Sequence, residues 1–314
     1  MNALPQTSAW GDYRELCLRT EALGYSSFWT YDHLVSRTSG GLGPTLECLT
    51  SIAALAPLTT RITLGSLVLA NEFRHPSLVA KAASTLSLIT GGRFALGMSA
   101  GSNSMEHTMF GVPYPAAGER VSRFAASASI IRSLLHGETV SLRDGIFELD
   151  NARLIPEVSP PKMAIGARGP RMLRLVSELA DIHVSAATPG ELRVLNRDLD
   201  ALCDRTGRPP ESVERAVIVY EACGSTEKAA AAKRSALETL FGRPFADLKN
   251  RVLQGSRDRL EERLGEYREA GADHVFVSTL PPYDHEFLEY FITDVAGGVA
   301  ATPRSIKEGS CDGS

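Results

Sequence analysis

The sequence has few cysteines, and they form no pattern. Five cysteines occur in 314 residues, and no two of them stand in a C-x-x-C pair. An odd number of scattered thiols argues against a disulfide framework and is typical of a reduced, cytoplasmic protein. The histidines also lack the spacing of metal ligands, so we expect no metal site.

The sequence also lacks a strong excess of charge of one sign and a long uninterrupted apolar run. A net charge of −4 provides no basic face for nucleic acid or anionic lipid. The longest apolar region, residues 49–70, is interrupted by Pro57 and Arg61, which argues against a transmembrane helix. We therefore expect a small-molecule partner, and neither nucleic acid nor a membrane.

What the sequence does contain is a regular alternation of two kinds of segment. Runs of β-branched, aromatic and aliphatic residues predict strands, and apolar residues three and four apart predict helices. The predicted strands cover residues 26–31, 61–69, 93–99, 162–165, 182–186, 213–222 and 273–278. The predicted helices cover residues 11–23, 45–58, 77–89, 118–136, 171–180, 189–206, 229–241, 257–270 and 285–295.

Strands that alternate with helices in this way are parallel and joined by crossover connections. Seven strands plus a stub at residues 3–4 predict a (β/α)₈ TIM barrel, whereas fewer strands would form an open, doubly wound sheet. The open sheet usually carries a G-x-G-x-x-G motif after an early strand, and none occurs here. The barrel is therefore favoured, with an incomplete first strand before Pro5.

One segment breaks the alternation. Residues 139–150 alternate in polarity around Asp144-Gly145, which predicts a β-hairpin insertion with a type I′ turn. No linker divides the chain, so residues 1–296 are predicted to form a single domain. Residues 297–314 are small, polar and aperiodic, and predict a flexible C-terminal tail.

Functional side chains of a parallel barrel stand just past the C-terminal ends of its strands. His33 is the only histidine at such a position with a carboxylate, Asp32, beside it. A histidine there can donate a hydrogen bond or relay a proton near neutral pH. A structural histidine bonded to a neighbouring loop is an equally good interpretation.

Two other strand ends carry small residues. Residues 166–170 start a helix with bare N–H groups and include Arg168, which suits a phosphate but also an ordinary turn. Residues 100–102 would let a flat ring approach the backbone, although a tight turn explains them equally well. Glu106 and His107 follow shortly after; they could be catalytic or solvated on a helix, and the solvated interpretation is favoured.

The order and spacing of several short stretches resemble the bacterial luciferase-like superfamily, and especially its F420-dependent branch. Within that branch, the Gly-Ala-Arg-Gly-Pro segment at residues 166–170 resembles that of methylene-tetrahydromethanopterin reductases. The matching stretches are residues 21–33 (EALGYSSFWTYDH), 64–68 (LGSLV), 74–76 (RHP), 90–97 (TGGRFALG), 110–113 (FGVP), 166–173 (GARGPRML) and 180–181 (AD). The match covers most of residues 12–190 and resumes at 255–277.

This resemblance implies coenzyme F420, or alternatively FMN, lying across the strand ends, and a homodimer. His33 would be the catalytic histidine near the reactive face of the ring. Leu67 and Val68 would form a bulge behind the ring, joined by a non-prolyl cis peptide. The cofactor-binding residues would be Asp32, Leu67, Val68, Gly101, Ser102, Gly166, Ala167, Arg168, Gly169, Pro170, Ser185 and Thr188.

Two departures from the family pattern point to the reaction. F420-dependent alcohol and sugar-phosphate dehydrogenases have a glutamate where Ser102 stands, and an aromatic residue where Arg37 stands. We therefore expect a reductase that passes hydride from F420 to a C=C or C=N bond of a small organic substrate. An FMN-dependent monooxygenase using reduced flavin and O₂, and a flavin-binding barrel without activity, remain alternatives.

Overall fold

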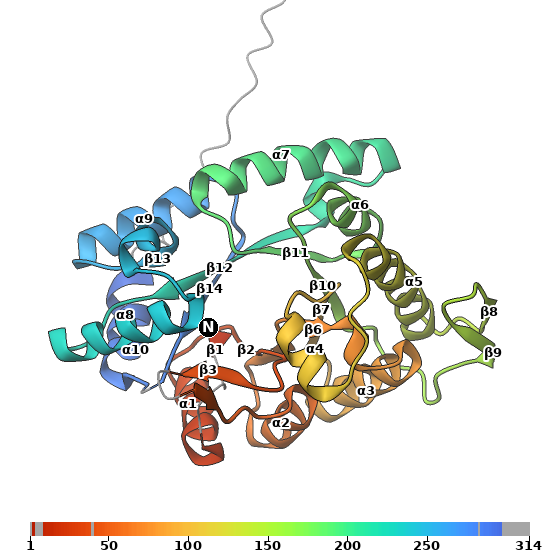
Figure 1. Cartoon of the computed structure of the whole chain (residues 1–314), viewed down its shortest axis with the longest axis horizontal. Coiled ribbons are helices and arrows are strands. Elements are labelled where there is room, and N and C mark those ends of the chain that lie inside the picture. The colour runs from red at the N-terminus through yellow and green to blue at the C-terminus, as the bar shows by residue number, and fades with distance from the viewer. Residues whose placement is uncertain (1, 4–8, 39–40, 282, 297–314) are drawn as a thin grey trace, which may run out of the picture.

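The computed structural model describes residues 2–3, 9–38, 41–281 and 283–296. Within these ranges, eight parallel strands close into a barrel with helices around it (Figure 1). Around the barrel they run β1 (Asn2–Ala3), β2 (Ser27–Thr30), β5 (Thr63–Ser66), β7 (Phe94–Ser99), β10 (Lys162–Gly166), β11 (Ile182–Ser185), β12 (Glu214–Glu221) and β14 (His274–Thr279). The predicted (β/α)₈ barrel is confirmed, and the open sheet is wrong.

The helices alternate with these strands much as the sequence predicts. They are α1 (Trp10–Ala22), α2 (Cys48–Leu55), α3 (Pro76–Thr90), α4 (Ser104–Phe110), α5 (Ala117–Leu135), α6 (Pro170–Leu179), α7 (Pro189–Thr206), α8 (Glu227–Phe241), α9 (Arg257–Glu269) and α10 (His285–Tyr290). Two short strands, β6 (Leu69–Ala70) and β13 (Val252–Leu253), pair with β7 and β12. A small hairpin, β3 (Ser36–Thr38) and β4 (Gly41–Gly43), follows β2.

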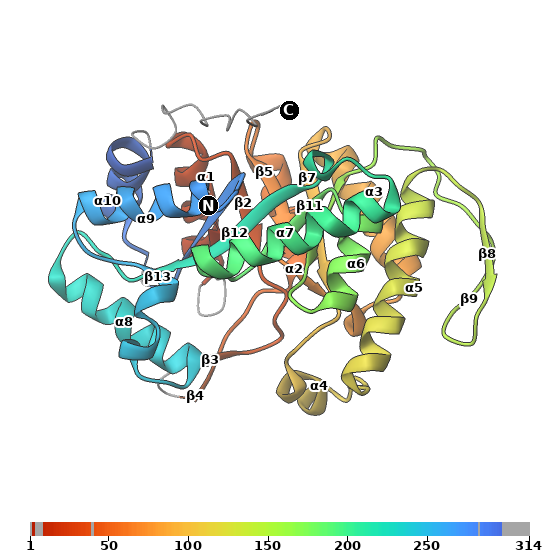
Figure 2. The ribbon, with the colours of Figure 1, turned by 90° about the horizontal axis from the view of Figure 1, so that it is seen from above.

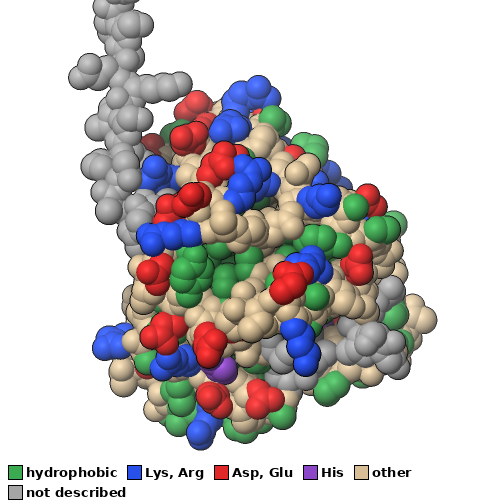
Figure 3. All heavy atoms as spheres, turned by 90° about the vertical axis from the view of Figure 1, so that its left-hand side faces the viewer, with side chains coloured by type: hydrophobic (Ala, Val, Ile, Leu, Met, Phe, Trp, Pro, Cys, Tyr) green, Lys and Arg blue, Asp and Glu red, His purple; other side chains and the backbone are tan. Residues whose placement is uncertain are grey.

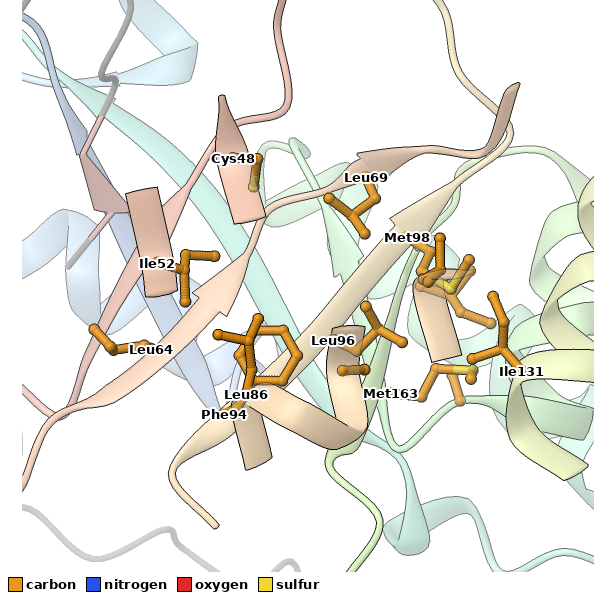
Figure 4. Packing of buried hydrophobic residues seen from close by; sticks show 14 of the residues in the cluster. Cys48, Ile52, Leu64, Leu69, Leu86, Phe94, Leu96, Met98, Ile131 and Met163 are labelled. Carbon is orange, nitrogen blue, oxygen red and sulfur yellow. The ribbon is translucent and has the colours of Figure 1, made fainter. Parts of the chain in front are cut away.

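The core has two layers. Between the strands and the outer helices, Ile52, Leu86 and Ile131 pack against apolar side chains of β5, β7 and β10 (Figure 4). Inside the barrel, Trp29 belongs to a second cluster of buried side chains. A Cβ on Gly65 would collide with the Trp29 ring, so glycine makes room for that indole.

The bulge expected after β5 is present. The peptide between Leu67 and Val68 is cis, as the resemblance implies. The Ser66 hydroxyl donates to the carbonyl oxygen of Gly97 and accepts from its N–H, each at 2.9 Å. A Cβ at position 97 would collide with the Ser66 carbonyl, so β7 needs glycine where the bulge approaches it.

The predicted hairpin insertion is confirmed as β8 (Val140–Arg143) and β9 (Glu148–Ala152), which projects beyond α5 (Figure 2). The type I′ turn is wrong, because Arg143 pairs with Glu148 and residues 144–147 form a longer loop. The Asp144 carboxylate accepts the N–H groups of Ile146 and Phe147, each at 2.8 Å. An aspartate that satisfies loop amides in this way stabilises a longer turn than the dipeptide pattern suggests.

The barrel seam is closed by the short strand β1. Asn2 and Ala3 pair with residues 29–30 on one side and 278–279 on the other. Leu4, the other residue of the predicted stub, lies outside the described residues, as do residues 297–314 of the predicted tail. Both β2 and β14 begin before the residues that pair with β1. A cavity of about 380 Å³ is lined by the beginnings of these two strands, α9 and the segment after α10.

This geometry predicts that a longer first strand would stabilise the barrel. An extension upstream of Met1 with four alternating β-branched and polar residues should pair with both β2 and β14 and fill the cavity. Each 1 kcal/mol gained raises Tm by about 1.5 °C in a protein of this size. Differential scanning calorimetry would measure it against a Gly-Ser extension of equal length. Equal melting temperatures for the two extensions would show that the seam does not accept a strand there.

The mixed charge of the surface and the unpaired cysteines agree with the small net charge and the scattered cysteines of the sequence. On the face that carries α8, α9 and α10, side chains of both charges are interspersed around a hollow with hydrophobic side chains (Figure 3). The cysteines of the described ranges are buried free thiols.

Among the residues that the structure describes, none of the helices has both the length and the apolar composition of a membrane-spanning segment. No group of three His, Cys, Asp or Glu residues there could hold a metal ion.

Candidate active site

A cavity of about 430 Å³ opens at the C-terminal ends of the barrel strands, from β2 round to β12. It brings together most of the residues that the sequence predicted. Those that line it are Asp32, His33, Leu67, Val68, Gly101, Ser102, Gly166, Ala167, Arg168 and Ser185. Gly169, Pro170 and Thr188 are not among its lining residues, because they begin the helices α6 and α7.

Glu106 is the residue that sequence reasoning missed. Its side chain is 1% exposed, and its oxygens lie 3.1 and 3.2 Å from Nδ1 of His33. It also accepts the N–H groups of Leu34 at 2.7 Å and Val35 at 3.2 Å, and the Asn103 amide at 2.8 Å. The prediction of a solvated Glu106 is therefore wrong, because α4 lies against the loop that follows β2.

The charge state of Glu106 determines which ring nitrogen of His33 donates to it. Burial alone would raise the pKa of Glu106, but the hydrogen bond and charge of His33 and the N–H groups of Val35 and Leu34 outweigh it. The pKa of Glu106 therefore lies below its ordinary value, and the carboxylate is ionised near neutral pH. An ionised carboxylate only accepts, so Nδ1 of His33 donates to it and Nε2 is left for the cavity.

His107, next on α4, is also buried rather than solvated, so this prediction is wrong too. Its Nδ1 lies 2.8 Å from the carbonyl oxygen of Pro113. Its ring contacts Phe73 and Tyr114, with centroids 4.9 and 4.8 Å away. It lines the cavity beside Gly101, whose positive φ of 73° suits glycine. Figure 2 shows α4 and the β3–β4 hairpin at the same end of the barrel.

Asp32 stands at the cavity wall with both oxygens occupied. It accepts two hydrogen bonds from the Arg74 guanidinium, at 2.7 and 2.8 Å, and one from the Ala70 N–H at 2.9 Å. Arg74 also pairs with Glu47 at the start of α2. Asp32 therefore joins the end of β2 to the segment after the bulge, and it positions both.

The far side of the cavity, at β10 and β11, has two polar side chains, Arg168 and Ser185, among small and apolar residues. The Ser185 hydroxyl is buried in the wall and has no hydrogen-bond partner among the described residues. A buried polar group in that condition suits a ligand that supplies the partner. Arg168 is half exposed and lies 3.4 Å from Glu191, which also binds Arg251. The hydrogen bond from Arg251 and the N–H of Thr188 lower the pKa of Glu191 to about 2.

Comparison with known proteins agrees with this arrangement. The family model described as luciferase-like monooxygenase matches residues 2–276. The chain is 31% identical to an F420-dependent glucose-6-phosphate dehydrogenase of Amycolatopsis mediterranei, over 57% of this chain and 54% of that protein. The alignment therefore spans about half of that relative's length. The chain is also 28% identical to a 5,10-methylenetetrahydromethanopterin reductase of Methanolobus tindarius, over 81% of this chain and 71% of that protein.

Among solved structures, an F420-dependent secondary alcohol dehydrogenase in complex with an F420–acetone adduct superimposes with a TM-score of 0.84. The superposition covers 95% of this chain and 98% of that one, at 17% sequence identity. Identity this low shows a shared fold, whereas the family match covers most of the sequence. The chain belongs to the luciferase-like monooxygenase family.

Proposed function

We propose that this protein is an F420-dependent oxidoreductase that reduces a C=C or C=N bond of a small organic substrate. The observation that carries the proposal is the His33–Glu106 pair, held at the wall of a cavity whose residues fit a deazaflavin. The names of the two relatives and of the solved structure described above include F420 or a tetrahydromethanopterin substrate. These names support the same class of chemistry. When bound, F420 supplies the hydride.

The cavity residues fit such a cofactor in two parts. Around the bulge, Leu67, Val68 and the glycines at 101 and 166 give a wall without polar side chains, which suits the face of a flat ring. Further round the barrel, the unpartnered Ser185 hydroxyl and Arg168 suit a polar tail with a phosphate. The starts of α6 (Gly169 and Pro170) and α7 (Thr188) would complete the tail site with backbone N–H groups.

Reduction of a double bond needs one proton besides the hydride, and His33 is placed to supply it. Its Nδ1 donates to an ionised carboxylate, which orients the ring and leaves Nε2 to pass a proton to the substrate. Glu106 itself is occupied by four donors, and it therefore orients His33 rather than exchanging a proton. Ser102 stands where the dehydrogenases have a glutamate, and Glu106 does not replace that glutamate, because its four hydrogen-bond donors keep it from taking a hydroxyl proton.

Cofactor choice provides the first test. Oxidised F420 should bind at least tenfold more tightly than FMN, measured side by side by fluorescence quenching. Arg168→Ala should weaken F420 binding but leave binding of the deazaflavin riboside, which lacks the phosphate tail, unchanged. Tenfold tighter binding of FMN would replace this proposal with an FMN-dependent monooxygenase. If F420 binds more tightly, the consumption of reduced F420 in the presence of activated alkenes and of imines would identify the substrate class.

We also propose a homodimer, by analogy with the family. The outer face of α3 exposes Leu78, Leu88 and Ile89, and exposed apolar side chains on one helix suit a protein contact. Sedimentation equilibrium of the wild type, and of a Leu78→Lys/Leu88→Lys variant, would test this. A monomeric wild type would refute it.

A further inference from the structure

His107 presents a hydrogen-bond acceptor to the cavity. A carbonyl oxygen accepts and cannot donate, so the contact of Nδ1 with the Pro113 carbonyl makes Nδ1 the donor. In the neutral imidazole the other nitrogen, Nε2, then carries the lone pair. Phe73 and Tyr114 pack against the ring, and flipping it over would break the hydrogen bond to Pro113. The tautomer is therefore set by the protein before any ligand binds.

The acceptor atom lies where a ligand can reach it. Nε2 of His107 makes no hydrogen bond to any described residue. It stands 3.8 Å from the position that a Cβ on Gly101 would take, and Ala70 stands 3.9 Å from the same point. Ala70 lies two residues after the bulge, so the acceptor borders the part of the cavity that we assign to the ring. It is a single acceptor beside the apolar side chains of Ala70 and Phe73.

We propose that His107 accepts a hydrogen bond from the pyrimidine N3–H of the bound cofactor and thereby fixes which way the ring faces. The inference rests on the proposed function in taking a deazaflavin as the ligand. An oxidised deazaflavin or flavin has one ring N–H, at N3 between two carbonyl groups, and a fixed acceptor selects that edge. With the tail held near Arg168 and Ser185, this contact determines which ring carbon lies beside His33.

The test removes the acceptor and keeps the internal hydrogen bond. In His107→Asn, the side-chain amide still donates to the Pro113 carbonyl, but no atom remains at the position of Nε2. The Kd of oxidised F420 should rise by about five- to tenfold, the usual effect of one hydrogen bond. The Kd of an F420 derivative methylated at N3 should not rise in the variant, because that ligand cannot donate to Nε2. His107→Gln, whose longer amide reaches toward the position of Nε2, should recover part of the lost affinity.

Equal F420 affinity in His107→Asn and the wild type would overturn the inference. So would an equal loss of affinity for F420 and its N3-methyl derivative, because that result would indicate a structural role alone. If His107→Asn does not fold, the Kd values of F420 and its N3-methyl derivative are measured for His107→Gln. This variant should bind F420 more weakly than the wild type does, and should bind the N3-methyl derivative no more weakly. If the wild type binds FMN and not F420, the proposed function fails. FMN and N3-methyl-FMN, which share the ring edge, then test His107 separately.

Discussion

Replacing His33 with alanine should lower turnover by about 10²–10⁴-fold, the usual contribution of general acid–base assistance, with little change in Tm. The His33 side chain is about one-third exposed and lines the cavity. Without it, Glu106 keeps its bonds to Leu34, Val35 and Asn103, so the loop should hold its shape. Steady-state oxidation of reduced F420, together with the Kd of F420, would separate lost chemistry from lost binding.

The controls for His33 use the same assay. His136→Ala, an exposed histidine outside the cavity, should behave like the wild type. Added imidazole should restore part of the activity of His33→Ala, because a free base can enter the space left by the side chain. Turnover within a few-fold of the wild type would mean that His33 is structural.

The second large effect is expected from Glu106→Gln, because it changes the tautomer of His33 at nearly constant shape. The glutamine oxygen can still accept from Leu34 and Val35, but its NH₂ group then faces Nδ1 of His33 and must donate to it. The proton moves to Nε2 of the neutral ring, and the imidazolium loses its carboxylate. An orienting carboxylate changed to an amide costs up to about 10⁴-fold in a serine protease triad, so we expect about 10²-fold or more here.

A double-variant comparison would show whether the two residues act as one unit. Glu106→Gln in the His33→Ala background should cost almost nothing further, since residues that act together are strongly non-additive. A full additional loss in the double variant would mean that Glu106 contributes to turnover independently of His33. Near-wild-type turnover of the single variant would show that the carboxylate only holds the loop.

The difference in stability between the wild type and Glu106→Gln should also depend on pH. The pKa of Glu106 is lower in the folded protein than its ordinary value of about 4.3. Its ionisation therefore stabilises the fold above that pH, and this contribution disappears as the pH falls through the folded-state pKa. The difference in unfolding free energy between wild type and variant should narrow on acidification. A constant difference across this range would show that the charge of Glu106 does not contribute to stability.

The sequence by itself determined the barrel and much of its strand-end chemistry. Periodicities of 2.0 and 3.6 residues belong to single segments, so the alternation along the chain predicted nearly every strand and helix. A helix between consecutive strands carries the chain back along the barrel, so neighbouring strands are parallel, and parallel strands gather their C-terminal residues at one end of the barrel. His33, the bulge at Leu67–Val68 and the turn at 166–168 therefore meet at one cavity, as expected.

Only the tertiary structure decided what surrounds these residues. Glu106 and His33 are 73 positions apart, and no local pattern places α4 against the loop after β2. Asp32 likewise finds its partner in Arg74, which lies beyond the next strand. A charged or polar side chain on a short helix has the same sequence pattern whether it faces solvent or a neighbouring loop. Its burial, its pKa and its partner come from the packing of elements distant in sequence, and so do the charge of Glu106 and the tautomer of His33 on which the proposed role of His33 depends.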